Sequence, residues 1–195
     1  MTISLKKDKW ETLPEMFFKE AQIQLNKPLL WYKKKDDKYH SYSWNEVKNK
    51  INLLRFKLQK IGLKKGDRVI IASENNPNWF ITDFAIMASG GVTVPAYTTY
   101  TKKDYQYLIK DCQAKILFIS NEQILLNILP AIKNNKKIKS IFSYKNINQI
   151  IDKRIINLES IWNEKVEKRS NKLNIFEDDP ACIIYTSGTS GVPKV

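Results

Sequence analysis

The chain has 195 residues, of which 43% are hydrophobic, and a formal net charge of +13 at pH 7. This composition predicts one folded globular domain and excludes wholesale disorder. No stretch approaches the roughly 20 continuous apolar residues that a membrane-spanning helix needs. Residues 1–11 are too charged for a secretory signal, so a cytoplasmic location is the default expectation.

The positive charge suggests a nucleic-acid partner, but the kind of basic residue argues against one. The chain contains 29 lysines and only 4 arginines, whereas base readout and bidentate phosphate contacts favour arginine. The lysines are also scattered in short clusters. We therefore expect no nucleic-acid partner. A cationic surface remains compatible with peripheral membrane contact, and the oligomeric state is not predicted.

Few residues are suited to metal binding or to nucleophilic catalysis. The two cysteines, Cys112 and Cys182, each lie in or beside an apolar run, which favours reduced, buried thiols over a metal or redox role. His40 is the single histidine, and its polar and aromatic neighbours indicate a surface or turn residue. A histidine-based zinc site or a Ser-His-Asp triad is therefore disfavoured.

The first strong pattern along the chain is a helix that ends a helical lead-in, residues 1–65. Ser43 and Glu46 have the spacing of a capping box, and apolar residues then recur at steps of three and four as far as Ile61. Gly62 stands where a C-terminal cap belongs. We expect the apolar stripe of this helix to pack in the core.

From Gly66 onward, short apolar runs alternate with helical patterns. Strands are predicted at 68–73, 92–95, 115–120, 138–143 and 181–185, with helices from Asn76 to Ala88, from Thr101 to about Cys112 and from Asn121 to about Asn134. Residues 144–178 are expected to form a surface excursion, most helical from Ile155 to about Arg169. The alternation over residues 66–185 predicts an α/β fold, a mostly parallel sheet with helices on both faces.

The stretch YTSGTSGVPK, residues 185–194, is the one motif that carries chemistry. It holds two of the six glycines and four hydroxyl residues, and it ends on Lys194. Glycines let backbone N–H groups approach an anion, hydroxyls add donors, and lysine adds a compact positive charge. We interpret residues 185–195 as a phosphate-binding loop at the carboxyl end of a strand. On composition alone, an ordinary Ser/Thr/Gly-rich turn is the commoner explanation.

Two familiar motifs fail on spacing. A Walker loop needs glycine directly before lysine, but Val192 and Pro193 precede Lys194 here. A nucleophile elbow needs glycine two residues to either side of a serine, but Ser190 is followed at that distance by Val192.

The loop sequence closely resembles the phosphate loop of adenylate-forming enzymes, the superfamily of acyl-CoA synthetases, peptide-synthetase adenylation domains and beetle luciferases. Two positions depart from the usual family pattern, Ser190 in place of threonine and Val195 in place of glycine. The resemblance extends over nearly the whole chain, through blocks at 66–80, 86–97 and 178–180. In the second block, Gly90-Gly91 would allow a tight helix-to-strand turn. The match is nearest to long-chain fatty acid–CoA ligases, through GDRV, NPNW and VPAYTTYT.

The resemblance implies a reaction in which a carboxylate attacks the α-phosphate of MgATP, giving an acyl-adenylate and pyrophosphate. A thiol, usually coenzyme A, then takes the acyl group. ATP, Mg²⁺ and coenzyme A are thus the implied cofactors and co-substrates, with a small-molecule carboxylic acid as partner. By similarity, the residues that would hold the β- and γ-phosphates are Thr186, Ser187, Gly188, Thr189, Ser190, Gly191 and Lys194.

In the family, the magnesium-binding glutamate, the ribose-binding aspartate and the adenylation lysine all lie beyond the position of Val195. We therefore expect this chain to be an N-terminal fragment with no catalytic residue of its own, inactive by itself. In the family, most of the acyl pocket also lies downstream of this position, so this sequence does not identify the carboxylic acid substrate. The alternatives are an aryl- or amino-acid-activating ligase and a non-catalytic nucleotide-binding domain.

Overall fold

A parallel sheet forms the centre of the chain, and the computed structural model describes residues 10–34, 36–147, 152–164, 172–187 and 193–194. Within these residues the sheet has the strand order β4-β3-β5-β6-β7, and every neighbouring pair is parallel. Its strands are β3 (Arg68–Ala72), β4 (Val92–Ala96), β5 (Ile116–Ile119), β6 (Ser140–Ser143) and β7 (Ile155–Asn157).

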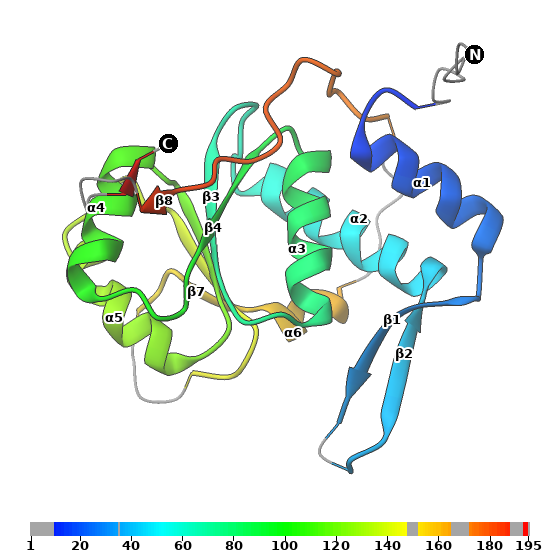
Figure 1. Ribbon diagram of the computed structural model, residues 1–195, viewed down its shortest axis with the longest axis horizontal. Helices are drawn as coiled ribbons and strands as arrows, with labels where there is room; N and C mark the ends of the chain where they lie inside the picture. The colour runs from blue at the N-terminus through cyan, green and yellow to red at the C-terminus, as the bar shows by residue number, and fades with distance from the viewer. Residues whose placement is uncertain (1–9, 35, 148–151, 165–171, 188–192, 195) are drawn as a thin grey trace, which may run out of the picture.

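Helices cover both faces of this sheet (Figure 1). α4 (Lys102–Cys112) and α5 (Glu122–Ile132) lie on one face, and α2 (Trp44–Lys60), α3 (Pro77–Ala88) and α6 (Leu158–Trp162) lie on the other. Because side chains alternate along a strand, Ile70 joins the first core cluster and Val69 the second. The predicted α/β fold with two helical layers is confirmed.

Local capping signals set where the helices begin. Ser43 and Glu46 form the predicted capping box of α2, and Thr101 and Asp104 form a second box at α4. The side chain of Asn76 accepts from two backbone amides at the start of α3, which satisfies donors that a helix N-terminus leaves free. Asn121 caps α5 in the same way. These helices confirm the predicted positions, with α5 ending at Ile132 rather than near Asn134.

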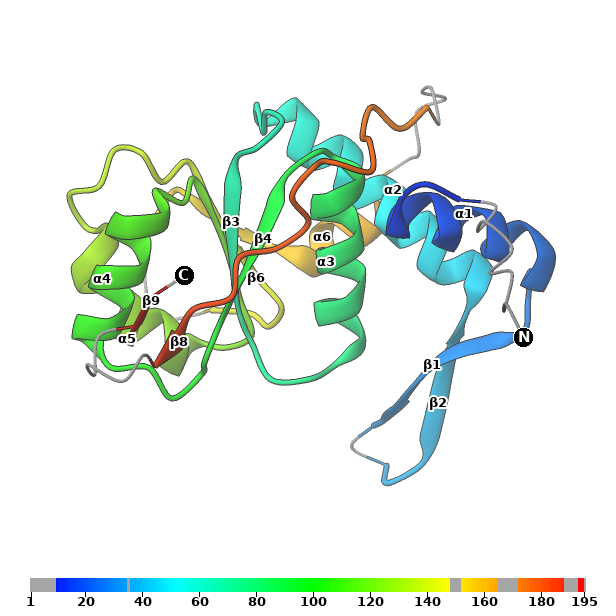
Figure 2. The same cartoon turned by 45° about the horizontal axis from the view of Figure 1, so that its top comes forward.

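The lead-in contains an element that the sequence pattern did not predict. Between α1 (Leu13–Gln24) and α2, a two-stranded antiparallel hairpin pairs β1 (Pro28–Lys33) with β2 (Tyr39–Ser43). At its base, Leu29, Leu30 and Tyr42 pack against the cluster that surrounds Phe17 and α2. The rest of the hairpin projects from the body of the molecule (Figures 1 and 2). His40 lies within β2, half-buried, rather than in a turn.

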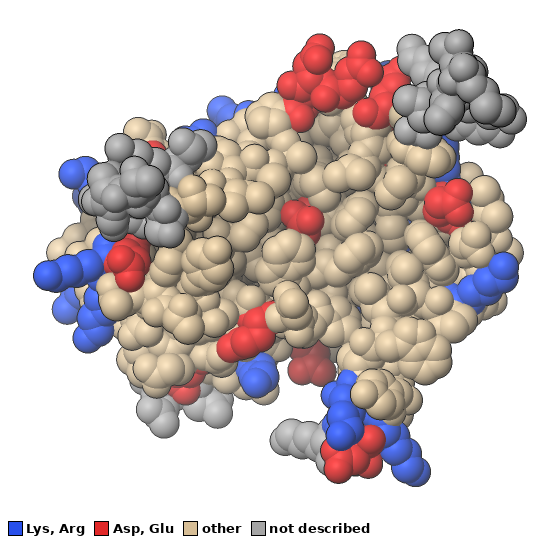
Figure 3. All heavy atoms as spheres, in the orientation of Figure 1, with Lys and Arg blue, Asp and Glu red and all other residues tan. Residues whose placement is uncertain are grey.

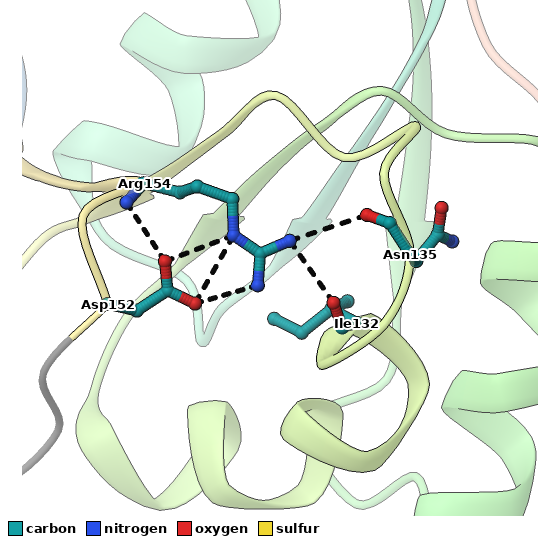
Figure 4. A network of polar contacts seen from close by, with 4 residues as sticks. All are labelled: Ile132, Asn135, Asp152 and Arg154. Carbon is teal, nitrogen blue, oxygen red and sulfur yellow. Dashed lines mark hydrogen bonds and ion pairs between the residues drawn. The ribbon is translucent and has the colours of Figure 1, made fainter.

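The prediction of helix from Ile155 to about Arg169 is wrong at its start. Residues 155–157 form β7 beside β6, and α6 occupies only Leu158–Trp162; residues 165–169 lie outside the described part of the chain. Arg154 explains why a strand forms here (Figure 4). Its guanidinium donates to the carboxylate of Asp152, from Nη2 to Oδ2 at 2.7 Å. Nη1 donates to the carbonyls of Ile132 and Asn135 at 3.1 and 3.4 Å. This contact with the end of α5 directs Ile155 along β6.

The two cysteines differ in their surroundings. Cys112 is buried as predicted, and burial raises the pKa of its thiol to about 11. Cys182 is exposed, so the prediction of a buried thiol is wrong there. The reason is that Cys182 lies along the outer edge of β4, with no further strand beside it among the described residues. Across those residues, no helix combines the length and apolar character that crossing a bilayer would require.

Candidate functional site

The chain leading to the candidate phosphate-loop sequence is anchored on Lys65, beside the turn between α3 and β4. Asp179 pairs with Lys65 at 2.8 Å and accepts from the Phe176 amide at 2.8 Å. The Lys65 hydrogen bond and the Phe176 amide hold the pKa of the Asp179 carboxyl below its usual value. Lys65 also packs against the turn between α3 and β4. Its side chain lies 3.5 Å from the position that a Cβ on Gly90 would take.

Past this anchor, the chain runs for a short distance beside β4. The Thr93 amide donates to the Ala181 carbonyl at 3.0 Å, and the Ile183 amide donates to the Thr93 carbonyl at 2.9 Å. These two bonds make a single parallel bridge between Thr93 and Cys182. The predicted strand 181–185 is therefore reduced to one bridge, because the chain leaves the sheet edge after Ile183.

The segment then crosses to the α4 side of the sheet (Figures 1 and 2). Tyr185 is 3% exposed, and its ring packs edge-on against Tyr107 with centroids 6.4 Å apart. The Tyr185 hydroxyl donates to Asp111 Oδ2 at 2.5 Å. Tyr185 is thus fixed to α4 by both an apolar and a polar contact, immediately before the candidate loop begins.

The ends of the loop sequence pair with each other through the backbone. β8 (Thr186–Ser187) and β9 (Pro193–Lys194) form a short antiparallel ladder in which Thr186 faces Lys194 and Ser187 faces Pro193. Three of the seven predicted phosphate-binding residues, Thr186, Ser187 and Lys194, are therefore brought together. The other four, Gly188, Thr189, Ser190 and Gly191, lie outside the described residues.

The described residues contain no group of three or more His, Cys, Asp or Glu side chains that could hold a metal ion. The predicted binding residues of the loop are also hydroxyl, glycine and lysine, which suit an anion better than a bare cation.

A parallel sheet with helices on both faces, and a Ser/Thr/Gly-rich sequence that follows a single bridge to the edge strand β4, define an α/β protein with a candidate anion-binding segment. The profile of the AMP-binding enzyme family matches residues 17–195. The chain belongs to the AMP-binding enzyme family.

Individual relatives agree with this assignment. The chain is 29% identical over 149 residues to the long-chain-fatty-acid–CoA ligase FadD15 of Mycobacterium tuberculosis, covering 76% of this chain and 25% of that protein. In structure it resembles acetoacetyl-CoA synthetase from Streptomyces lividans (TM-score 0.79, 18% identity, covering 93% of this chain and 29% of the other). It also resembles the anthranilate CoA ligase AuaEII in complex with anthranoyl-AMP (TM-score 0.76, 20% identity, covering 93% and 33%). The structural likenesses establish the fold. The chain spans about a quarter of the length of the curated relatives it matches.

Proposed function

We propose that this chain supplies the triphosphate-binding loop of an adenylate-forming ligase that activates a carboxylic acid with ATP and passes the acyl group to coenzyme A. The observation that carries the proposal is the pairing of Thr186–Ser187 with Pro193–Lys194. This pairing brings the two ends of the sequence TSGTSGVPK together, with the lysine at one of them. Family membership supplies the reaction class.

In this proposal the loop acts on the leaving group of the first step. A carboxylate oxygen forms a bond to the α-phosphorus of ATP while the bond from that phosphorus to the bridging oxygen breaks, which releases pyrophosphate. Negative charge builds on the β- and γ-phosphates as that bond breaks. Backbone amides around Gly188 and Gly191 would donate to those oxygens, and Lys194 would add a formal positive charge. Magnesium, when bound to the nucleotide, would neutralise further phosphate charge.

A long-chain fatty acid is the proposed acyl substrate. Its support is that FadD15 and the rat protein ACSBG1 both carry the name long-chain-fatty-acid–CoA ligase, at 29% and 26% identity. The proposal also includes the division of the chain into a lead-in (1–65), a sheet region (66–185) and the loop (185–195). That residues 1–195 alone form no adenylate stays a prediction.

Titration of ATP into the purified protein tests the loop directly. Lys194→Ala should weaken ATP binding about tenfold to a hundredfold, because a hydrogen bond to a charged group contributes about 1.5–3 kcal/mol. Lys103→Ala is the matched control, since it removes the same charge from the exposed first turn of α4. Equal affinities for the two variants would show that general positive charge, and not the loop, attracts the nucleotide.

The acyl substrate requires a separate measurement on the complete ligase. Pyrophosphate exchange should be driven by long-chain fatty acids and not by benzoate or amino acids. Exchange with an aryl or amino acid alone would leave the ligase chemistry intact and overturn the proposed substrate.

A further inference from the structure

The projecting end of hairpin β1–β2 exposes large aromatic side chains. We call residues 31–34 and 36–41 the hairpin end. Within it Trp31 is 61% exposed and Tyr39 is 71% exposed. In the antiparallel register Trp31 faces Ser41 and Lys33 faces Tyr39. Cross-strand partners share a face, as do residues two apart along a strand, so Trp31 and Tyr39 lie on the same side of the hairpin.

Ring contacts on the opposite side of the hairpin stabilise the two strands that carry Trp31 and Tyr39. Tyr32 stacks on Tyr42 with ring centroids 4.9 Å apart, and His40 lies against Tyr32 at 6.0 Å. Lys50 from α2 lies over the Tyr42 ring at 5.2 Å, which ties the base of the stack to the body of the protein. The turn is closed by backbone hydrogen bonds from Lys34 to Lys38 and from Asp37 to Lys34. A pre-ordered element of this kind loses little conformational entropy on binding.

Charge at the hairpin end is mixed, with a surplus of lysine. Residues 31–41 contain four lysines and two aspartates, and Figure 3 shows both signs gathered there. Each aspartate is engaged locally: Asp37 pairs with Lys33 at 2.8 Å, and Asp36 contacts His40 at 3.2 Å. Lys33 lies on the same side of the hairpin as Trp31 and Tyr39, whereas the ammonium group of Lys34 lies over the Tyr32 ring on the opposite side, 6.0 Å from its centroid. Long lysine side chains at this end can reach beyond the rings while their ammonium groups stay in water.

We propose that the hairpin end docks on an anionic lipid surface, with Trp31 and Tyr39 in the headgroup region, Lys33 beside them, and the net positive charge of residues 31–41 attracting the lipid phosphates. Trp and Tyr favour this depth because their rings are apolar while their N–H and O–H groups stay hydrated. Each lysine near an anionic bilayer adds about 1 kcal/mol. The proposal is independent of the ATP loop.

The observations favour lipid over nucleic acid. Nucleic-acid binding draws mainly on phosphate neutralisation, which two aspartates among four lysines oppose. The apolar contribution of Trp31 and Tyr39 does not depend on that balance. Nucleic-acid sites also prefer arginine, and residues 31–41 contain none.

Vesicle co-sedimentation tests the proposal, with vesicles of phosphatidylcholine mixed with phosphatidylglycerol and vesicles of phosphatidylcholine alone. The protein should bind the mixed vesicles more tightly, and Trp31→Ser should lower that partitioning roughly tenfold. The control is Phe176→Ser, which removes a ring of similar exposure, 58%, from outside the hairpin. Trp31→Phe should retain most of the binding but lose part of the vesicle-induced blue shift in tryptophan emission.

Unchanged circular dichroism and thermal unfolding for Trp31→Ser would establish that the variant is folded. Equal loss of vesicle binding in Trp31→Ser and Phe176→Ser would overturn the proposal, as would the lack of vesicle binding by the unaltered protein. The proposal is also overturned if Trp31→Ser leaves vesicle binding unchanged; a reduction in oligonucleotide binding, or in self-association measured by sedimentation equilibrium, would then identify the partner instead.

Discussion

The hydroxyl of Tyr185 donates a hydrogen bond of 2.5 Å to Oδ2 of Asp111, joining the residue before the candidate phosphate loop to α4. Burial raises the pKa of Tyr185, and the hydrogen bond with Asp111 adds to the effect. The tyrosine therefore keeps its proton and remains a donor at physiological pH. Because Thr186 follows directly and pairs with Lys194, we expect this bond to position the start of the candidate loop.

Tyr185→Phe is expected to weaken ATP binding about fivefold to tenfold, since one hydrogen bond contributes roughly 1 kcal/mol. The substitution keeps the ring that packs on Tyr107 and removes only the hydroxyl. ATP titration measures the effect, with Tyr39→Phe as the control because that hydroxyl lies in the distant hairpin. If Tyr185→Phe lowers thermal stability while ATP affinity stays the same, the bond supports the fold and does not position the loop.

Two glycines at the base of the sheet should respond to substitution for different reasons. Gly66 has φ +78°, and a Cβ there would meet no atom within 4 Å. At Gly91, a Cβ would lie 3.0 Å from Ile86 Cγ2 and 3.2 Å from Leu63 Cδ2. Strain therefore governs Gly66, at about 1 kcal/mol for alanine, and crowding governs Gly91, at about 1–3 kcal/mol.

Asparagine separates these two causes. It tolerates positive φ better than alanine does, so Gly66→Asn should destabilise less than Gly66→Ala. At Gly91 the larger side chain should be worse, so Gly91→Asn should destabilise more than Gly91→Ala. Urea unfolding of the four variants measures the order. The same ranking at both positions would contradict the assignment.

Features set by neighbouring residues were predictable from the sequence, and features set by distant contacts were not. The capping boxes at Ser43 and Thr101 each involve a partner three residues away, so spacing alone reveals them. The strand at Ile155 depends on Arg154 reaching Ile132, 22 residues earlier. In the candidate site, the residue types indicated a loop, but the tether from Tyr185 to Asp111 spans 74 residues. No local pattern encodes that distance.

A buried ion pair at the start of β3 provides a third prediction. Lys115 Nζ lies 2.6 Å from Asp67 Oδ1, and the Asp67 side chain is 8% exposed. Burial alone would raise the pKa of Asp67, but the Lys115 hydrogen bond and the Lys64 amide lower it below its usual value. Lys115→Met should therefore cost roughly 1–2 kcal/mol, because it leaves the carboxylate without its cation. The Lys115 side chain is 35% exposed, which moderates the cost.

The pH dependence of this effect has a definite sign. Because the folded state lowers this pKa, the carboxylate stabilises the protein at pH values above its unfolded-state pKa of 3.8. This stabilisation is lost as the pH falls through the folded-state pKa. The difference between the wild type and Lys115→Met should shrink over that range. Lys57→Met is the control, since its partner Glu164, also at 2.6 Å, is 47% exposed. If Lys115→Met and Lys57→Met lower the free energy of unfolding equally at neutral pH, burial of Asp67 is not the cause of the destabilisation.

Asp83 on α3 should show the opposite pH dependence. Burial raises the pKa of its carboxyl, although the nearby Thr93 side chain opposes the shift. The folded state therefore holds the proton more tightly than the unfolded state, and stability falls as the pH rises from about 3.8 to the raised folded value. Asp83→Asn removes this penalty while keeping a side chain of nearly the same size and shape. At pH 7 we expect the variant to be more stable by about 1 kcal/mol, or roughly 2–4 °C in Tm, and the gain to vanish at pH values below 3.8.

Thermal unfolding across this pH range measures the gain in stability, with Asp178→Asn as an exposed control. A stabilisation by Asp83→Asn that is the same at every pH would mean that desolvation of the charged carboxylate is not its source.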